Sequence, residues 1–166
     1  MWYNYHLIEI CSGGEAVSGM EDVKNFGLRA FAPVSVAEAK MINPLALAYI
    51  GDAVFENYVR EIIVLTDETR KVHLMHRKAI AVVNAHSQAS LLEKIKGELD
   101  EKELYIVQRG KNSKPHTVPK NADVLEYKAA TAFEALLGYL YVIGEEERLA
   151  ELLKKICIEA GLLKKD

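Results

Sequence analysis

The stretch NPLALAYIGDAVFENYVR, residues 43–60, is apolar from its first leucine to Phe55 except at a single aspartate, Asp52. Asn is a favoured N-cap residue and Pro suits the first helical position, so this stretch predicts a long helix over residues 44–65. A helix that is apolar on nearly every side is a core helix. We therefore expect Asp52 to lie in the interior of the fold or on the floor of a cleft.

A second apolar segment, YKAATAFEALLGYLYVI at residues 127–143, carries Glu134 as its only charged residue after Lys128. Asp123 is a favourable start for this helix and Gly144 a favourable end. An unpaired buried carboxylate costs several kcal/mol, so each of the two acids must be protonated, paired or bound to a cation.

Two such carboxylates favour a shared cation. For one acid, pairing with Arg60 or Lys128, or protonation, would be a sufficient explanation. For two acids, each in an otherwise apolar stretch, a common metal ion is the better interpretation, and hard oxygen ligands completed by water suit Mg²⁺ or Mn²⁺. Asp52 and Glu134 are therefore candidate metal ligands and catalytic residues.

The neighbours of these acids along each helix are candidates for indirect roles. Glu56 lies one turn beyond Asp52, and Thr131 lies one turn before Glu134, so both can contact a metal ion through water. Glu56 can equally pair with Arg60. Small residues also border both acids and would allow the two helices to approach closely; they are Gly51, Ala53, Ala135 and Gly138.

The chain from residue 35 onward is predicted to be all-α. We expect helices over residues 36–41 and 70–95, a helix begun by Asp100 and Glu103 as a capping box, and a last helix after Glu145. Two prolines predict a loop over residues 110–122. Residues 1–34 lack a sustained period and are expected to form an extension, disordered or with a short strand at residues 5–10, beside a domain at residues 35–166.

Composition indicates a soluble, cytoplasmic protein. Half of the residues are hydrophobic and 27% are charged, and no uncharged apolar run approaches the ~18 residues of a membrane span. The N-terminus lacks the basic region of a secretory signal. Cys11 and Cys157 lie far apart, which favours a reduced compartment.

Positive charge is segregated although the formal net charge is -3. Residues 70–92 and 109–121 each hold four Lys or Arg and no acid, so these two segments carry +8 and the rest of the chain -11. This distribution can form a positive surface on an acidic protein, and it can equally be a pair of solvated faces.

Residues 43–60 resemble the signature helix of the ribonuclease III family, in which Gly-Asp follows an apolar stretch and the Asp binds the catalytic metal. Residues 127–141 resemble the other metal-binding helix of that family. The match is closest to the Mini-ribonuclease III branch, which lacks a double-stranded-RNA-binding domain, and it covers about residues 36–159. Larger members place two further carboxylates at the positions of Ala48 and Thr131.

The resemblance implies a helical ribonuclease III-like endonuclease domain that forms a two-fold homodimer, with Leu45, Ala48 and Tyr49 at the interface. It implies Mg²⁺-dependent hydrolysis of double-stranded RNA to 5′-phosphate and 3′-hydroxyl ends. The implied substrate is precursor large-subunit (23S) ribosomal RNA, with a ribosomal protein or pre-ribosomal particle as a possible partner. The expected phosphate contacts are Arg77, Lys78, Arg109, Lys111, Lys114 and Lys120.

Three other functions remain as alternatives. A non-catalytic helical RNA-binding module on the same fold is disfavoured by the presence of both Asp52 and Glu134. A metal phosphohydrolase could use His73 and His76, although two histidines on a basic helix are more often solvated. A cysteine nucleophile is weaker still, because Cys11 lies in the N-terminal extension and Cys157 in the terminal helix.

Overall fold

The computed structural model describes residues 32–67, 71–114 and 123–165, and these residues contain helices and no strand. The all-α prediction is therefore confirmed. The elements are α1 (Val36–Met41), α2 (Pro44–Thr66), α3 (Val72–Val83), α4 (Ala85–Ile95), the 3₁₀ turn η2 (Lys96–Glu98), α5 (Glu101–Lys111), α6 (Val124–Ile143) and α7 (Glu146–Glu159).

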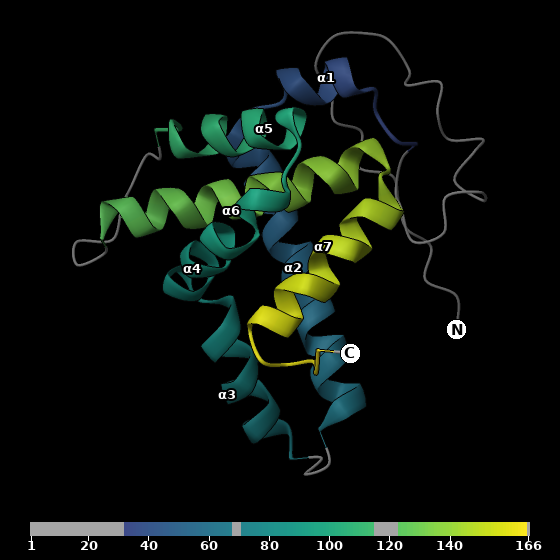
Figure 1. The fold of residues 1–166 in the computed structure, drawn as a ribbon, viewed down its shortest axis with the longest axis vertical. Helices are drawn as coiled ribbons and strands as arrows, with labels where there is room; N and C mark the ends of the chain where they lie inside the picture. Colours follow the sequence, from purple (N-terminus) through teal and green to yellow (C-terminus); the bar gives the residue numbers. More distant parts are fainter. Residues whose placement is uncertain (1–31, 68–70, 115–122, 166) are drawn as a thin grey trace, which may run out of the picture. The chain divides into compact units, whose positions relative to one another are not determined.

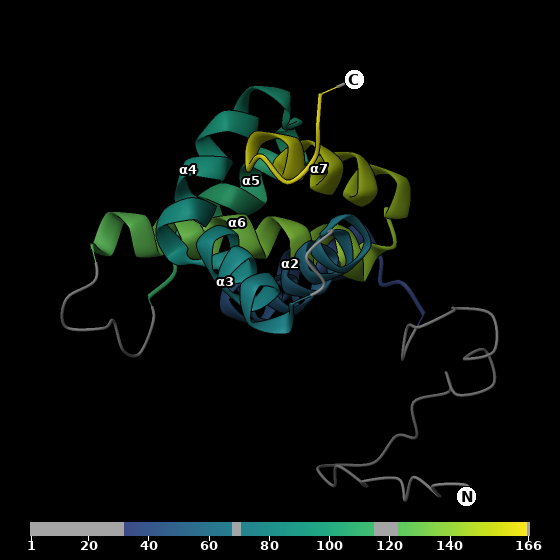
Figure 2. The ribbon, with the colours of Figure 1, turned by 90° about the horizontal axis from the view of Figure 1, so that it is seen from below.

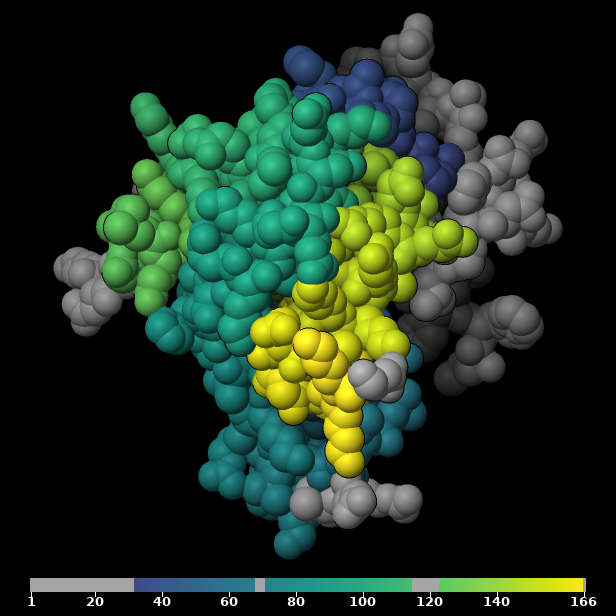
Figure 3. All heavy atoms as spheres, viewed as in Figure 1, coloured from purple at the N-terminus to yellow at the C-terminus, as the bar shows by residue number. Residues whose placement is uncertain are grey.

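Helix α6 is the centre of this helical domain, and half of its residues are buried. It crosses the first half of α2 (Figure 1), and α2 is its most extensive partner, followed by α5 and α4. Figure 2 shows α2 and α3 on one side of α6 and α4, α5 and α7 on the other. On the face drawn in Figure 3, α4, α5 and α7 cover the middle of α6.

The helix ends follow the chemistry expected from the sequence. The Asn43 side chain accepts a hydrogen bond from the backbone N–H of Leu45 at 2.9 Å, and Asp123 caps α6 in the same way at 2.8 Å. Gly144 ends α6 with φ of 79°, a left-handed conformation that costs little only for glycine. Both central helices therefore begin where their capping residues predict, and α6 also ends at its predicted glycine.

The prediction of one helix over residues 70–95 is wrong, because the chain turns at Asn84. The backbone of Asn84 is extended, and its side-chain N–H groups donate to the carbonyl oxygens of Ile80 and Ala81, both at 3.0 Å. Its side-chain oxygen accepts from the N–H of Ser87 at 3.0 Å. One side chain thus ends α3 and starts α4, so the two helices take different directions (Figure 1).

Other predictions fall partly outside the described residues. Helix α5 continues to Lys111, and the rest of the expected loop is described only as far as Lys114. The expected strand at residues 5–10 and almost all of the expected extension lie outside the described residues. In the part of the chain that is described, no helix combines the length and apolar character needed to cross a membrane.

Candidate active site

Two glycines bring α2 and α6 into backbone contact. A methyl group on Gly51 would overlap the carbonyl oxygen of Glu134, and one on Gly138 would overlap the carbonyl oxygen of Leu47. Only glycine at both positions permits this approach. Because Asp52 follows Gly51 directly, the contact places its backbone beside that of Glu134 at the crossing of the two helices.

An aromatic pair packs next to the two acids. The rings of Phe55 and Phe133 meet edge to face, with centroids 5.0 Å apart and an interplanar angle of 77°. Both side chains are completely buried. Phe55 lies one turn after Asp52 and Phe133 immediately precedes Glu134, so this apolar contact joins α2 and α6 next to the two acids along each helix.

Burial and neighbouring negative charge disfavour the charged forms of both acids. Partial burial is the main cause that raises the pKa of Asp52, and repulsion from Glu56 adds to it while Arg60 acts in the opposite direction. Burial raises the pKa of Glu134 to about 7, with a further contribution from the negative charge of Asp52. A cation bound by both carboxylates would offset the cost of burial and the repulsion from negative charge, which is why such a pair suits a metal site.

The neighbours Glu56 and Thr131 both have partners within their own helices. Arg60 donates to the Glu56 carboxylate at 2.5 Å, as one of the two alternatives for Glu56 predicts. The Thr131 hydroxyl donates to the carbonyl oxygen of Tyr127 at 3.0 Å. The electrostatic influence of Glu56 nevertheless reaches both Asp52 and Glu134, so Glu56 belongs to the surroundings of the site.

Gln88 is a residue of the site that the sequence analysis missed. Its side chain lowers the pKa of the Glu134 carboxylate, against the effect of burial. Gln88 is only 2% exposed and lies on the buried face of α4. The signal that could have revealed it is Asn84: if a new helix starts there, Gln88 falls on the same face as Leu91 and Leu92.

The available donors fit an ion that keeps most of its water. In the described ranges, no group of three or more His, Cys, Asp or Glu side chains is placed to hold a metal. His73 and His76 are exposed on α3 and form no such group. Mg²⁺ commonly binds through one or two carboxylates, with water and substrate phosphate as its other ligands, so Asp52 and Glu134 match that ion.

Several predicted RNA contacts are held in other interactions. Lys78 pairs with the buried Asp67 at 2.7 Å and thereby links α3 to the end of α2. Lys111 pairs with Glu93 at 3.1 Å. The Arg109 guanidinium donates to the backbone carbonyl oxygens of Lys40, at 2.6 Å, and Ile42, at 3.1 Å. Arg109 therefore holds the connection between α1 and α2.

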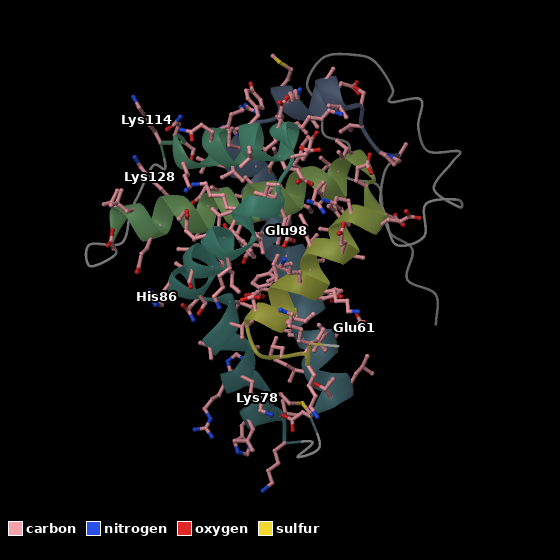
Figure 4. All side chains as sticks on the ribbon, viewed as in Figure 1. Glu61, Lys78, His86, Glu98, Lys114 and Lys128 are labelled. Carbon is pink, nitrogen blue, oxygen red and sulfur yellow. The ribbon has the colours of Figure 1, made fainter. Side chains whose placement is uncertain are left out.

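The remaining predicted contacts lie at two places. Arg77 is exposed on α3. Lys114, just after α5, lies at the same end of the packed helices α5 and α6 as Lys128 (Figure 4). Lys128 is not among the RNA contacts that the sequence predicts. Lys120 lies outside the described residues.

The expected dimer residues differ in exposure. Tyr49 is 83% exposed, which is unusual for a tyrosine on a core helix, while Leu45 is half-buried. Ala48 is 5% exposed within the single chain. It faces the inside of the domain and has little surface to offer a second chain.

Cys157 has the properties of a core residue. It is completely buried, and burial raises the pKa of its thiol to about 12. The thiol is therefore protonated near neutral pH and is a poor nucleophile. Cys11 lies outside the described residues.

Comparison with known proteins shows the family. The Ribonuclease III domain model matches residues 45–145, which include both acids of the site. A Mini-ribonuclease 3 of Clostridium tetani is 41% identical over 72% of this chain and 79% of its own length, and one of Enterococcus faecalis is 47% identical over 69% and 87%.

A solved structure supports the same assignment. A protein of Fusobacterium nucleatum has a crystal structure that aligns with a TM-score of 0.64 at 33% identity, over 72% of this chain and 94% of that one. This likeness confirms the expected all-α, ribonuclease III-like fold. The chain therefore belongs to the ribonuclease III family and, within it, to the Mini-ribonuclease 3 group of endoribonucleases.

Proposed function

We propose that this endoribonuclease depends on Mg²⁺, which Mn²⁺ can replace, and that it cuts double-stranded RNA to leave 5′-phosphate and 3′-hydroxyl ends. The observation that carries the proposal is the pair Asp52 and Glu134, which lie at a helix crossing with both pKa values raised by burial and by negative charge. Two partly buried acids whose pKa values are raised are costly to keep charged unless the site binds a cation.

Asp52 and Glu134 would hold the metal directly or through water. When bound, Mg²⁺ supplies a Lewis acid that activates water and stabilises negative charge on the phosphate. The chain itself supplies preorganisation: the glycine contact fixes the distance between the two helices, and the Phe55–Phe133 contact keeps that part of the core rigid. Glu56 and Thr131 are proposed to act on the site through water.

The RNA contacts are proposed at the two basic regions. A-form RNA is recognised mainly through its phosphates, 2′-hydroxyl groups and shape, so lysines on an exposed surface are suitable contacts. Arg77 and Lys78 would serve on α3, with Lys111, Lys114 and Lys120 following α5. The position of Lys128 beside Lys114 adds it to the second group. Arg109 would contribute mainly by holding the α1–α2 connection against which this region packs.

A two-fold homodimer would supply the second cut that a double strand requires. Tyr49 and Met41 expose large apolar side chains at the first half of α2 and just before it. Met41 and Leu45 also line a surface hollow of about 530 Å³. Exposed apolar groups of this kind support self-association, in which each subunit would cut one strand.

The natural substrate is proposed from the resemblance to the Mini-ribonuclease III branch. It would be precursor large-subunit (23S) ribosomal RNA in the cytoplasm, so the enzyme would act in ribosome biogenesis. A ribosomal protein or a pre-ribosomal particle would present the cleavage site.

Replacing Asp52 tests the proposal. Asp52→Asn keeps the shape of the side chain and removes the charge that a metal needs, so cleavage of long double-stranded RNA should be abolished while circular dichroism stays unchanged. Glu61→Gln is the matched control, because Glu61 is an exposed carboxylate on the same helix. Near-normal turnover of Asp52→Asn at saturating Mg²⁺ would contradict the assigned role.

A further inference from the structure

Two lysines share one carboxylate at the edge of the surface proposed to bind RNA. The Lys111 ammonium, at the end of α5, donates to Oε1 of Glu93 on α4 at 3.1 Å. Lys96, just after α4, lies 3.8 Å from Oε2 of the same carboxylate. Lys114 follows Lys111 by three residues and lies at the same end of the packed helices as Lys128 (Figure 4). Glu93 therefore places a negative charge beside a group of lysines.

The fold does not depend on this ion pair. Helices α4 and α5 each pack extensively on α6, which holds both of them in place. The Glu93 side chain is 58% exposed and the Lys111 side chain 29% exposed, and exposed ion pairs add little to stability. The hydrogen bond from Lys111 is the main cause that lowers the pKa of Glu93, so this carboxylate is charged at neutral pH. Its main influence is therefore on the charge of Lys111.

The same ammonium cannot serve Glu93 and an RNA phosphate equally well. A charged N–H···O contact is about 2.8 Å long, so a phosphate oxygen bound to Lys111 would lie within about 6 Å of the Glu93 oxygen. Two negative groups at that distance repel each other, and they compete for the donors of one lysine. A full contact with phosphate thus requires Lys111 to turn away from Glu93.

Lys96 makes this exchange of partners feasible. It lies near Oε2, so Glu93 keeps a positive neighbour when Lys111 leaves Oε1. A lysine carries its charge on a flexible four-carbon stem, so its ammonium can move while the helices stay in place. Binding to RNA phosphate also releases condensed counterions, which favours the phosphate over a weak exposed ion pair.

We propose that Glu93 competes with RNA phosphate for Lys111 and thereby limits the affinity of the enzyme for double-stranded RNA. This inference rests on the proposed role of Lys111 as an RNA contact. In the free enzyme Glu93 neutralises Lys111, and in the complex Lys111 binds phosphate while Lys96 stays beside Glu93. An acidic side chain is thus a functional part of the RNA surface.

The test is binding of the full chain to a labelled RNA duplex at several salt concentrations, with a chelator present to prevent metal-dependent cleavage. Glu93→Gln keeps the shape of the side chain and removes its charge. We expect about 2- to 5-fold tighter binding at low salt, which is the range that an exposed ion pair supports. The log–log salt slope should become steeper by up to about 1. The matched control is Glu101→Gln, which removes an exposed carboxylate at the other end of α5 and should change neither quantity.

Lys111→Gln separates the possible failures. It should weaken binding, and Glu93→Gln added to it should then act no differently from Glu101→Gln, because no ammonium remains to compete for. Suppose that Lys111→Gln weakens binding, but Glu93→Gln matches the control, weakens binding or tightens it equally without Lys111. The competition is then refuted and the RNA contact stands. If Lys111→Gln binds RNA as the wild type does, Lys111 is not an RNA contact, and both proposals for it are overturned.

Discussion

The pKa of Glu134, on α6, depends on groups from two other helices: the negative charge of Asp52 on α2 raises it, and the Gln88 side chain on α4 lowers it. Burial is the largest influence and raises its pKa to about 7 from an ordinary value of 4.5. In the metal-free protein, its charge is therefore unfavourable at neutral pH. A bound cation would favour the charged form, so metal and proton compete for this carboxylate.

The pH dependence of stability follows from this shift. The pKa of Glu134 is higher in the folded state, so protonated Glu134 favours folding. Its contribution to the free energy of unfolding is fully present below pH 4.5 and is lost as the pH rises through about 7. Glu134→Gln should therefore stabilise the metal-free protein at pH 8 by about 2 kcal/mol and leave it nearly unchanged at pH 4.5, since one pKa unit corresponds to about 1.4 kcal/mol and the group retains some hydration.

Urea unfolding in the presence of a chelator, at several values between pH 4.5 and 8, would measure this difference. Glu61→Gln, which replaces an exposed carboxylate on α2, is the matched control. If the stability of Glu134→Gln varies with pH as that of the wild type does, then folding does not raise the pKa of Glu134.

For single residues, the sequence reveals those that interrupt a regular pattern of apolar residues. Asp52 and Glu134 stand out as candidate site residues because each is the lone charge in an apolar helix. Gln88 and Arg109 could not be assigned, since their partners lie on other parts of the chain. Gln88 reaches Glu134 across 46 positions, and Arg109 reaches carbonyl oxygens near residue 40.

At the level of the helices, the turn at Asn84 is the main feature that periodicity could not predict. Apolar residues recur through residues 74–91 in a way that suits one continuous helix, and an asparagine within it is tolerated. Packing decides otherwise, because α3 packs on α2 whereas α4 packs on α6: Ile80 is 50% exposed, while Gln88 is buried. Tertiary contact thus outweighed local pattern where the two differ.

The crossing of α2 and α6 can be tested by adding a single methyl group. Gly51→Ala would force the two helices apart, because its Cβ would overlap the backbone of Glu134. We expect a decrease in stability of about 3 kcal/mol and loss of cleavage, although both acids are retained. Gly97→Ala in η2 is the matched control, because its Cβ would meet nothing within 4 Å. Thermal unfolding and cleavage assays of both variants check this, and a fully active Gly51→Ala would refute the close contact.

At the scale of the whole molecule, the proposed dimer depends on exposed apolar groups near the start of α2. Tyr49→Glu places a charge on a side chain that is 83% exposed, so a monomeric chain should tolerate it. If that surface is the interface, the variant should sediment as a monomer and cut both strands of a labelled duplex poorly. A wild-type chain that is monomeric at micromolar concentration and cuts both strands efficiently would contradict the dimer.

The proposed RNA surface can be tested by the salt dependence of binding. Replacing Lys114 and Lys128 with glutamine should weaken binding to double-stranded RNA and reduce the log–log salt slope by about 2, or about 1 for each lysine that binds a phosphate. The control with equal charge change is Lys164→Gln with Lys165→Gln, at the exposed end of the chain. Equal slopes for the two double variants would mean that the end of α5 and α6 does not contact RNA, and α3 would become the main candidate.

The glycine contact between α2 and α6 predicts that activity and fold are lost together on heating or in denaturant. Binding groups in many enzymes lie on loops, which open locally long before the protein unfolds. Here the acids project from the middle of two helices, at the most extensive contact in the described chain. The backbone amides around them should therefore be among the last to exchange with solvent, and heat or denaturant should inactivate the protein in the same cooperative transition that unfolds it.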